Sequence, residues 1–91
     1  MKELEINFVG KGQVKGFIFT QIKKNSKGYI YKVEDSGRTY YEVFKHKINT
    51  QFNCISYPSN KGFGVWAWTC MSLERAFDKL EEITIIGGSN V

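Results

Sequence analysis

The strongest constraint on the fold is a two-residue alternation that recurs in three consecutive segments separated by turn sequences. It runs along 14–23 (VKGFIFTQIK), 29–34 (YIYKVE) and 38–47 (RTYYEVFKHK). Such alternation sends successive side chains to opposite faces and is typical of β-strands. The separators, NSKG at 25–28 and DSG at 35–37, contain the residues that tight turns favour. The centre of the chain is therefore predicted to be an antiparallel meander.

Further strands are expected on both sides of this meander. Leu4, Ile6 and Phe8 alternate with polar residues near the start, and 51–57 (QFNCISY) alternates in the same way. The segment 62–70 (GFGVWAWTC) is expected to be a last long strand, in which alternation would place Trp66 and Trp68 on one face.

One amphipathic helix is expected after the strands. Ser72 suits the N-cap and Glu74 the first turn, and apolar residues then repeat at helical spacing, at Leu73, Ala76, Phe77 and Leu80. We expect 84–86 to form a short strand or a packed tail, and 87–91 to fray.

These elements predict a single α+β domain over 1–91 with a compact core over about 3–86. Its expected architecture is an antiparallel, twisted sheet of about five to six strands with one C-terminal helix packed on one face. A single helix cannot cover so wide a sheet, so aromatic side chains on the far face need a second layer or a partner.

Charge and hydropathy restrict the functional classes. The net charge is +4, yet 11–61 holds ten Lys or Arg against three acids, whereas 62–91 holds two against four. A basic middle predicts a face that attracts anions, although lysines also keep sheet edges soluble. The apolar runs are too short for a membrane span and the start has no apolar signal segment, so we expect a soluble, cytoplasmic protein without membrane association.

No residue pattern is typical of catalysis, cofactor binding or metal binding. Cys54 and Cys70 lack CxxC spacing and are expected to be buried free thiols. His46 is flanked by lysines and is expected at the surface. Glu42 could join another strand carboxylate, but cross-strand ion pairs with lysine are the simpler expectation. We therefore expect no enzyme, no cofactor and no metal.

The favoured function is binding of single-stranded DNA or RNA, with little sequence preference, on a sheet face that carries basic and aromatic side chains together. Aromatic rings stack with bases for about 1–3 kcal/mol each, and cations follow the backbone. The residues expected to meet phosphates are Lys15, Lys23, Lys32, Arg38, Lys45 and Lys47, and those expected to stack are Tyr29, Tyr31 and Tyr40. The competing interpretation of these aromatic residues is that they form the core of a small domain.

The stretch YYEVFKHKINTQFNCISYPSNKGFGVWAW at 40–68 resembles a small uncharacterised family of Bacteroidetes genomes and their phages or mobile elements. The resemblance covers about 14–83 and implies a domain boundary but no activity. The expected topology is also similar to PUR-type modules, which pack as dimers and hold single strands on curved sheets, although no PUR motif matches residue by residue. The alternative function is a protein-interaction module without catalysis, either a homodimer or an accessory factor that docks on a partner protein.

Overall fold

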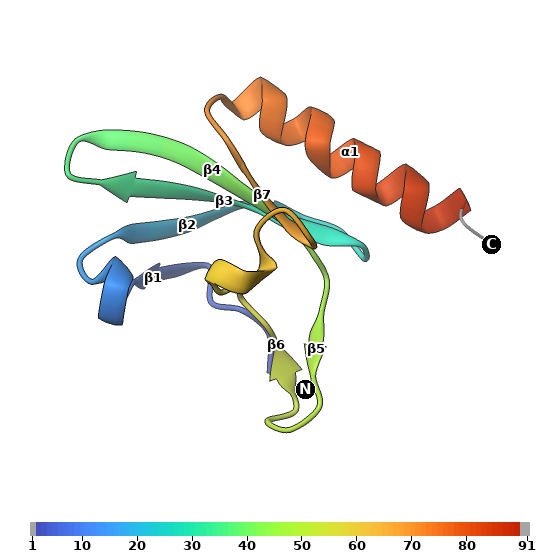
Figure 1. The fold of residues 1–91 in the computed structure, drawn as a ribbon, viewed down its shortest axis with the longest axis horizontal. Coiled ribbons are helices and arrows are strands. Elements are labelled where there is room, and N and C mark those ends of the chain that lie inside the picture. Colours follow the sequence, from blue (N-terminus) through green and yellow to red (C-terminus); the bar gives the residue numbers. More distant parts are fainter. Residues whose placement is uncertain (1, 90–91) are drawn as a thin grey trace.

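A computed structural model describes residues 2–89 as an α+β fold with an open antiparallel sheet and one C-terminal helix (Figure 1), which confirms the predicted fold class. The five-stranded sheet has the order β1-β2-β3-β4-β7, and β5 and β6 form a separate two-stranded sheet. The strands are β1 Asn7–Val9, β2 Ile18–Lys24, β3 Gly28–Asp35, β4 Arg38–Lys45, β5 Ile48–Asn49, β6 Cys54–Ile55 and β7 Ala67–Cys70. The helices are the 3-10 turns η1 Gly12–Val14 and η2 Asn60–Gly62 and the α-helix α1 Leu73–Ser89.

The meander forms where the alternation and the turn residues predict it. Asn25 Oδ1 accepts hydrogen bonds from the backbone N–H groups of Lys27 at 2.7 Å and Gly28 at 3.0 Å, and this bends the chain from β2 into β3. Ser36 and Gly37 have φ of 51° and 86°, the left-handed pair that a two-residue hairpin between β3 and β4 requires.

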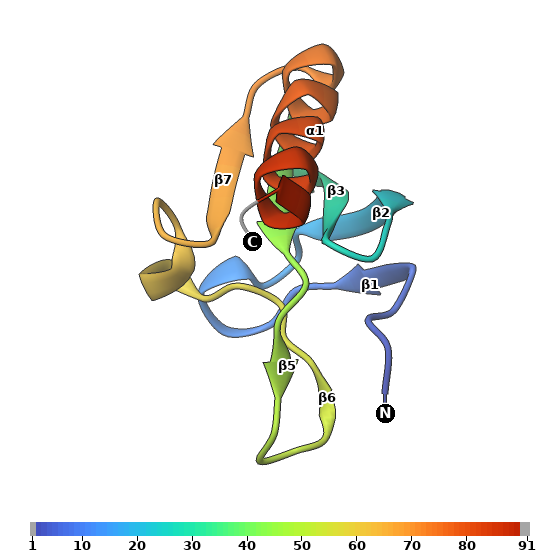
Figure 2. The ribbon, with the colours of Figure 1, turned by 90° about the vertical axis from the view of Figure 1, so that its right-hand side faces the viewer.

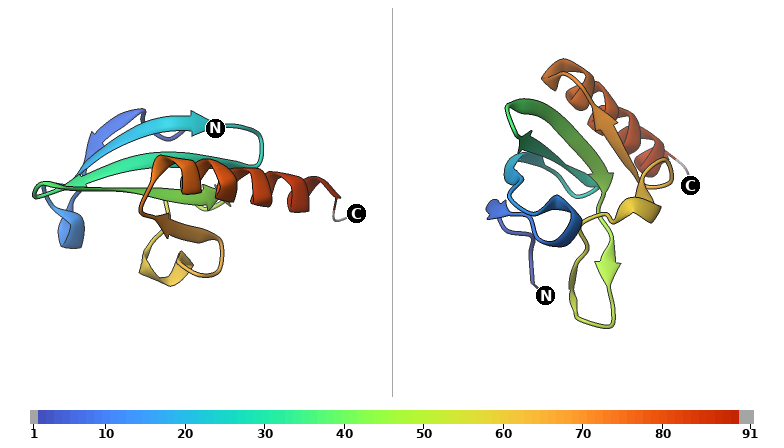
Figure 3. Two further views of the ribbon diagram at one scale, coloured as in Figure 1. Left: turned by 90° about the horizontal axis from the view of Figure 1, so that it is seen from above. Right: turned by 60° about the vertical axis from the view of Figure 1, so that its left-hand side comes forward.

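Helix α1 covers part of one face of the sheet, here called the helix side (Figure 3). The backbone N–H of Arg75 donates to Ser72 Oγ at 3.2 Å, so Ser72 is the predicted N-cap. The buried stripe of the helix is Ala76, Leu80 and Ile83, which pack against β3, β4 and β7.

The end of the chain differs from the prediction because this stripe continues beyond Leu80. Ile83 is 5% exposed and keeps the helix on the sheet. Thr84 Oγ1 donates to the Leu80 carbonyl at 2.6 Å and accepts from Asn25 Nδ2 at 3.0 Å. The segment 84–86 is therefore helical, not a strand, and the predicted frayed end is helical through Ser89, with 90–91 outside the described residues.

The opposite face, here called the aromatic side, is covered by the chain itself. The N-terminal segment, the β5–β6 sheet and the segment around η2 lie across the molecule from α1 (Figures 1 and 2). They bring Leu4, Ile55, Tyr57, Phe63 and Trp66 against the aromatic side chains of the sheet. This is the second layer that the sequence requires.

The outer strands are shorter than predicted, and the two tryptophans do not share a face. β7 begins only at Ala67, because 64–66 form a turn in which Gly64 has φ of 85° and the Trp66 N–H donates to the Gly62 carbonyl at 2.9 Å. Half-buried Trp66 consequently packs on the aromatic side and half-buried Trp68 on the helix side.

None of the helices in the part of the chain that the structure describes combines the length and the apolar character needed to cross a membrane.

Candidate functional site

The predicted basic and aromatic sheet face is not formed. Tyr29 and Tyr31 are 1% and 0% exposed and belong to the aromatic-side core, and half-buried Tyr40 packs against it. Lys32 follows Tyr31 on β3 and therefore points to the other face. Tyr29 and Tyr31 are therefore closed off from bases in the folded chain, because the second layer covers them, whereas Tyr40 is only half-buried.

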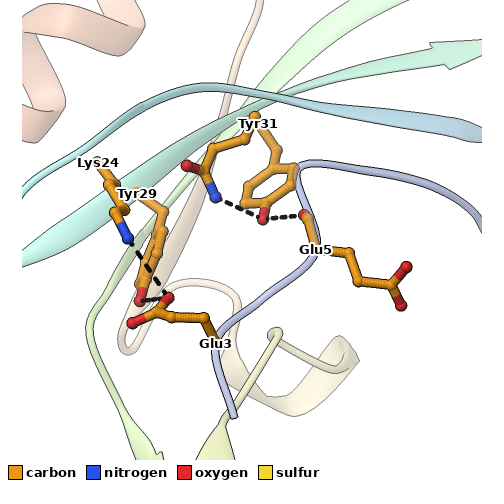
Figure 4. Close-up of polar contacts among 6 residues, drawn as sticks. Glu3, Glu5, Lys24, Tyr29 and Tyr31 are labelled. Carbon is orange, nitrogen blue, oxygen red and sulfur yellow. Dashed lines mark hydrogen bonds and ion pairs between the residues drawn. The ribbon is translucent and has the colours of Figure 1, made fainter.

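Both buried tyrosines bind the N-terminal segment instead (Figure 4). Tyr29 Oη donates to Glu3 Oε1 at 3.0 Å, and Tyr31 Oη donates to the Glu5 carbonyl at 2.6 Å and accepts from Gln21 Nε2 at 2.9 Å. Burial raises the pKa of both phenols, and for Tyr29 the bond to Glu3 raises it further. These hydroxyls therefore stay protonated donors and have a structural role.

The cations predicted to bind phosphate lie on several parts of the surface. Two pair with a carboxylate: Lys32 Nζ is 3.9 Å from Glu34 Oε2, and Arg38 Nη2 is 2.9 Å from Asp35 Oδ2. Two lie over an aromatic ring: Lys23 Nζ is 5.8 Å from the centroid of Phe77, and Lys47 Nζ is 4.8 Å from that of Trp66. The remaining two are exposed, with Lys15 after η1 and Lys45 at the end of β4. These six side chains do not form one surface with the tyrosines.

A cavity of about 340 Å³ on the aromatic side offers a different site. Its walls are the rings of Phe8, Phe19, Tyr57 and Phe63 together with Val9, Gly10, Val14 and Pro58. Phe8 and Phe19 stack with ring centroids 4.7 Å apart, and Tyr57 meets both edge-on. This volume and this aromatic lining are typical of sites for a small flat group.

Glu42 of β4 is the carboxylate that the sheet contributes to the cavity lining. Glu42 lies two positions from both Tyr40 and Phe44 on β4, so its side chain points to the aromatic side as theirs do. There Tyr57 Oη donates a hydrogen bond to Glu42 Oε1 at 2.5 Å. Burial raises the pKa of the Glu42 carboxyl, and the bond from Tyr57 partly opposes this increase. The bond from Tyr57 uses Oε1, and Oε2 takes no part in it, so an acceptor remains for a ligand.

A cationic groove adjoins the cavity. It has a volume of about 540 Å³ and is lined by Lys11, Gln13, Val14, Pro58, Ser59, Asn60 and Lys61, without an acidic residue. Lys11, Val14, Pro58 and Asn60 line both hollows. Asn60 Nδ2 donates to Gln13 Oε1 at 2.9 Å and ties the η1 and η2 regions together at this junction.

Glu5 also contributes to the cavity lining, but its side chain is exposed. Its carbonyl is held by Tyr31, and Figure 4 shows its carboxylate directed away from that ring. Glu5 therefore lies at the rim, whereas Glu42 comes from the sheet.

The other residues considered for chemistry lie elsewhere. His46 stacks on Tyr29 with ring centroids 5.9 Å apart, and neither it nor a cysteine lines the cavity. Both cysteines are free thiols as predicted, but only Cys70 has the predicted burial, since Cys54 is half-buried. In the described part of the chain, no group of three or more His, Cys, Asp or Glu side chains is placed to hold a metal ion.

Sequence reasoning missed the residues that form this site. Lys11 and Lys61 lie in short 3-10 regions without periodicity, and only the folded chain brings them together. Glu42 did carry a signal, because it interrupts a row of aromatic residues that alternation assigns to one face.

Comparisons with family models, curated proteins and solved structures found no match to this chain. The resemblance to the Bacteroidetes family and the similarity to PUR-type modules stay predictions.

Proposed function

We propose that this protein binds single-stranded nucleic acid by taking one base into the aromatic cavity while the adjoining phosphates lie in the groove of Lys11 and Lys61. The observation that supports this most is the shared wall, since four residues line both a cavity rich in aromatic rings and a groove with two cations and no acid. A nucleotide has the same division, because a flat ring carries hydrogen-bonding edges at one end and an anionic backbone at the other.

This arrangement favours single strands over duplexes. A base in a duplex is stacked and paired, and extracting it costs a few kcal/mol, whereas a base in a single strand is already accessible. Three of the cavity rings, those of Phe8, Phe19 and Tyr57, pack on one another, so a base would enter a hollow whose walls are largely preformed.

The test is fluorescence anisotropy of labelled single-stranded oligonucleotides, with the duplex of the same sequence as a comparison. We expect single strands to bind more tightly, and their affinity to fall with added salt. Each phosphate contact on a single strand contributes about 0.7 to the slope of log K against log salt, so losing two should reduce the slope by about 1.4. Lys11→Ala with Lys61→Ala is the variant for this measurement.

Lys27→Ala is the matched control, because Lys27 is exposed at the β2–β3 turn, at the opposite end of β2 from η1. It removes a cation of the same kind without touching the groove. An unchanged salt slope in the Lys11 and Lys61 variant, or an equal loss in the Lys27 variant, would contradict the proposed site. Absence of any binding to single strands would contradict the function.

Self-association is a second candidate, supported by an exposed apolar pair. Val9 and Ile18 oppose each other on β1 and β2 and are 58% and 47% exposed, and α1 packs on β3, β4 and β7 instead. The partner that we consider for this exposed pair is a second copy of the chain. Light scattering with size-exclusion chromatography would detect a dimer, and Ile18→Lys should dissociate it; a monomer at all concentrations would eliminate this candidate.

A further inference from the structure

We infer that the base accepted by the cavity is guanine, read by Glu42. This inference rests on the proposed function and adds a ligand identity to the same site. It follows from where the carboxylate lies and from which hydrogen-bonding groups each base can present to it.

The entry direction determines which edge of the base reaches Glu42. Lys11 and Asn60 are shared with the cationic groove, whereas Glu42 belongs to β4 in the sheet. A nucleotide with its phosphates in the groove therefore points its far edge toward the sheet. In every base the Watson–Crick edge lies across the ring from the sugar, so this edge is the one that Glu42 meets.

An ionised carboxylate only accepts hydrogen bonds and has about four lone-pair sites. Tyr57 occupies one site on Oε1, which leaves the remainder of Oε1 and all of Oε2 for a ligand. Two parallel N–H groups on one edge would match these two oxygens in the bidentate geometry that makes carboxylate pairs strong.

Guanine is the common base with two adjacent donors on this edge, N1–H and the 2-amino group. Adenine and cytosine present one amino group beside a ring nitrogen acceptor, and thymine and uracil present one N–H between two carbonyls. In each of these cases an acceptor lone pair would face a carboxylate oxygen, which is repulsive. A site that leaves a buried polar group unpaired discriminates strongly against the ligand that lacks the donor.

The experiment uses short thymine oligonucleotides with one central position that carries guanine, inosine, adenine, cytosine or thymine. Anisotropy competition should show guanine binding about 5- to 150-fold more tightly than thymine, the range expected for one bidentate base contact. Inosine keeps N1–H and lacks the 2-amino group, so its affinity should fall between the two. Equal affinities for guanine and thymine, or for guanine and inosine, would overturn the inference.

Glu42→Gln tests the protein side of the same contact. Its amide offers one acceptor and one donor in place of two acceptors, so the preference for guanine over thymine should disappear while the salt slope stays unchanged. The inosine comparison needs no variant and decides the question even if this substitution prevents folding.

The two proposals fail in distinguishable ways. Salt-dependent binding without base preference would overturn the guanine assignment and leave the proposed function standing. Absence of binding to all five oligonucleotides would overturn both, and preference for a base other than guanine would overturn the role of Glu42.

Discussion

The hydrogen bond from Tyr57 to Glu42 can be tested by removing a single oxygen. Tyr57→Phe keeps a ring that contacts Phe8, Phe19, Tyr31 and Phe44, so the packing of the aromatic side is retained. What is lost is a bond to a half-buried carboxylate, and bonds to charged groups contribute about 1.5–3 kcal/mol. For a domain of this size, each kcal/mol corresponds to roughly 4–8 °C in melting temperature.

The loss should depend on pH, and the sign follows from the pKa of Glu42. Burial raises this pKa and the Tyr57 bond lowers it, so the variant has a folded-state pKa still higher than that of the native chain. A group with a raised folded-state pKa contributes stability that is fully present below the unfolded pKa and lost as the pH rises through the folded pKa. Tyr57→Phe should therefore cost more stability at about pH 8 than at about pH 4.

The assay is urea unfolding at both pH values, followed by tryptophan fluorescence. Trp66 is a suitable reporter because its ring lies 6.3 Å from that of Phe44 within the aromatic-side core. Glu42→Gln is the control background, since an amide does not titrate and the cost of Tyr57→Phe should there be independent of pH. An equal cost at both pH values in the native background would refute the assigned interaction.

Three further predictions concern the fold. Gly28→Ala would place a Cβ 2.6 Å from the Phe44 carbonyl oxygen and 2.8 Å from Ile83 Cδ1. Thermal melts should therefore show a free energy of unfolding lower by about 1–3 kcal/mol. Ser26→Ala, at an exposed position in the same turn, should leave it unchanged. In native alkylation kinetics the half-buried Cys54 should react before Cys70, whose burial raises its thiol pKa, and the difference should vanish in urea; faster reaction of Cys70 would contradict its placement. Tyr31→Phe removes the hydrogen bonds to Glu5 and Gln21, so hydrogen exchange of the backbone amides of 2–6 should become faster. Tyr40→Phe is the control and should leave this exchange unchanged, because the Tyr40 hydroxyl makes no hydrogen bond within the described residues.

The elements that were predictable are those specified by local sequence. The assignment of Tyr29, Tyr31 and Val33 to one face and Ile30 to the other followed from alternation and is confirmed. The turns at 25–28 and 35–37 and the N-cap at Ser72 each depend on residues within a few positions of one another. Such features need no knowledge of the rest of the chain.

The second layer could not be predicted, because its position depends on contacts between distant residues. Tyr57 lies in a segment without regular structure and is held by rings from β1, β2, β3 and β4. Alternation separates the two faces of a strand but does not say which face the remaining chain will cover. Tyr29 and Tyr31 were therefore assigned to the correct face of the sheet, but the sequence did not indicate that the second layer would cover this face and bury them.

Glu42 gives a way to separate a structural role from a binding role. A buried hydrogen-bonded polar pair can often be replaced by apolar groups of similar shape with little or no loss of stability, because both desolvation costs are removed together. Glu42→Met combined with Tyr57→Phe makes this replacement, and we expect its free energy of unfolding to equal or exceed that of the native chain. Its preference for guanine should nevertheless be lost. If the double variant is instead several kcal/mol less stable, the pair is required for packing, and the reason to assign Glu42 to a ligand would disappear.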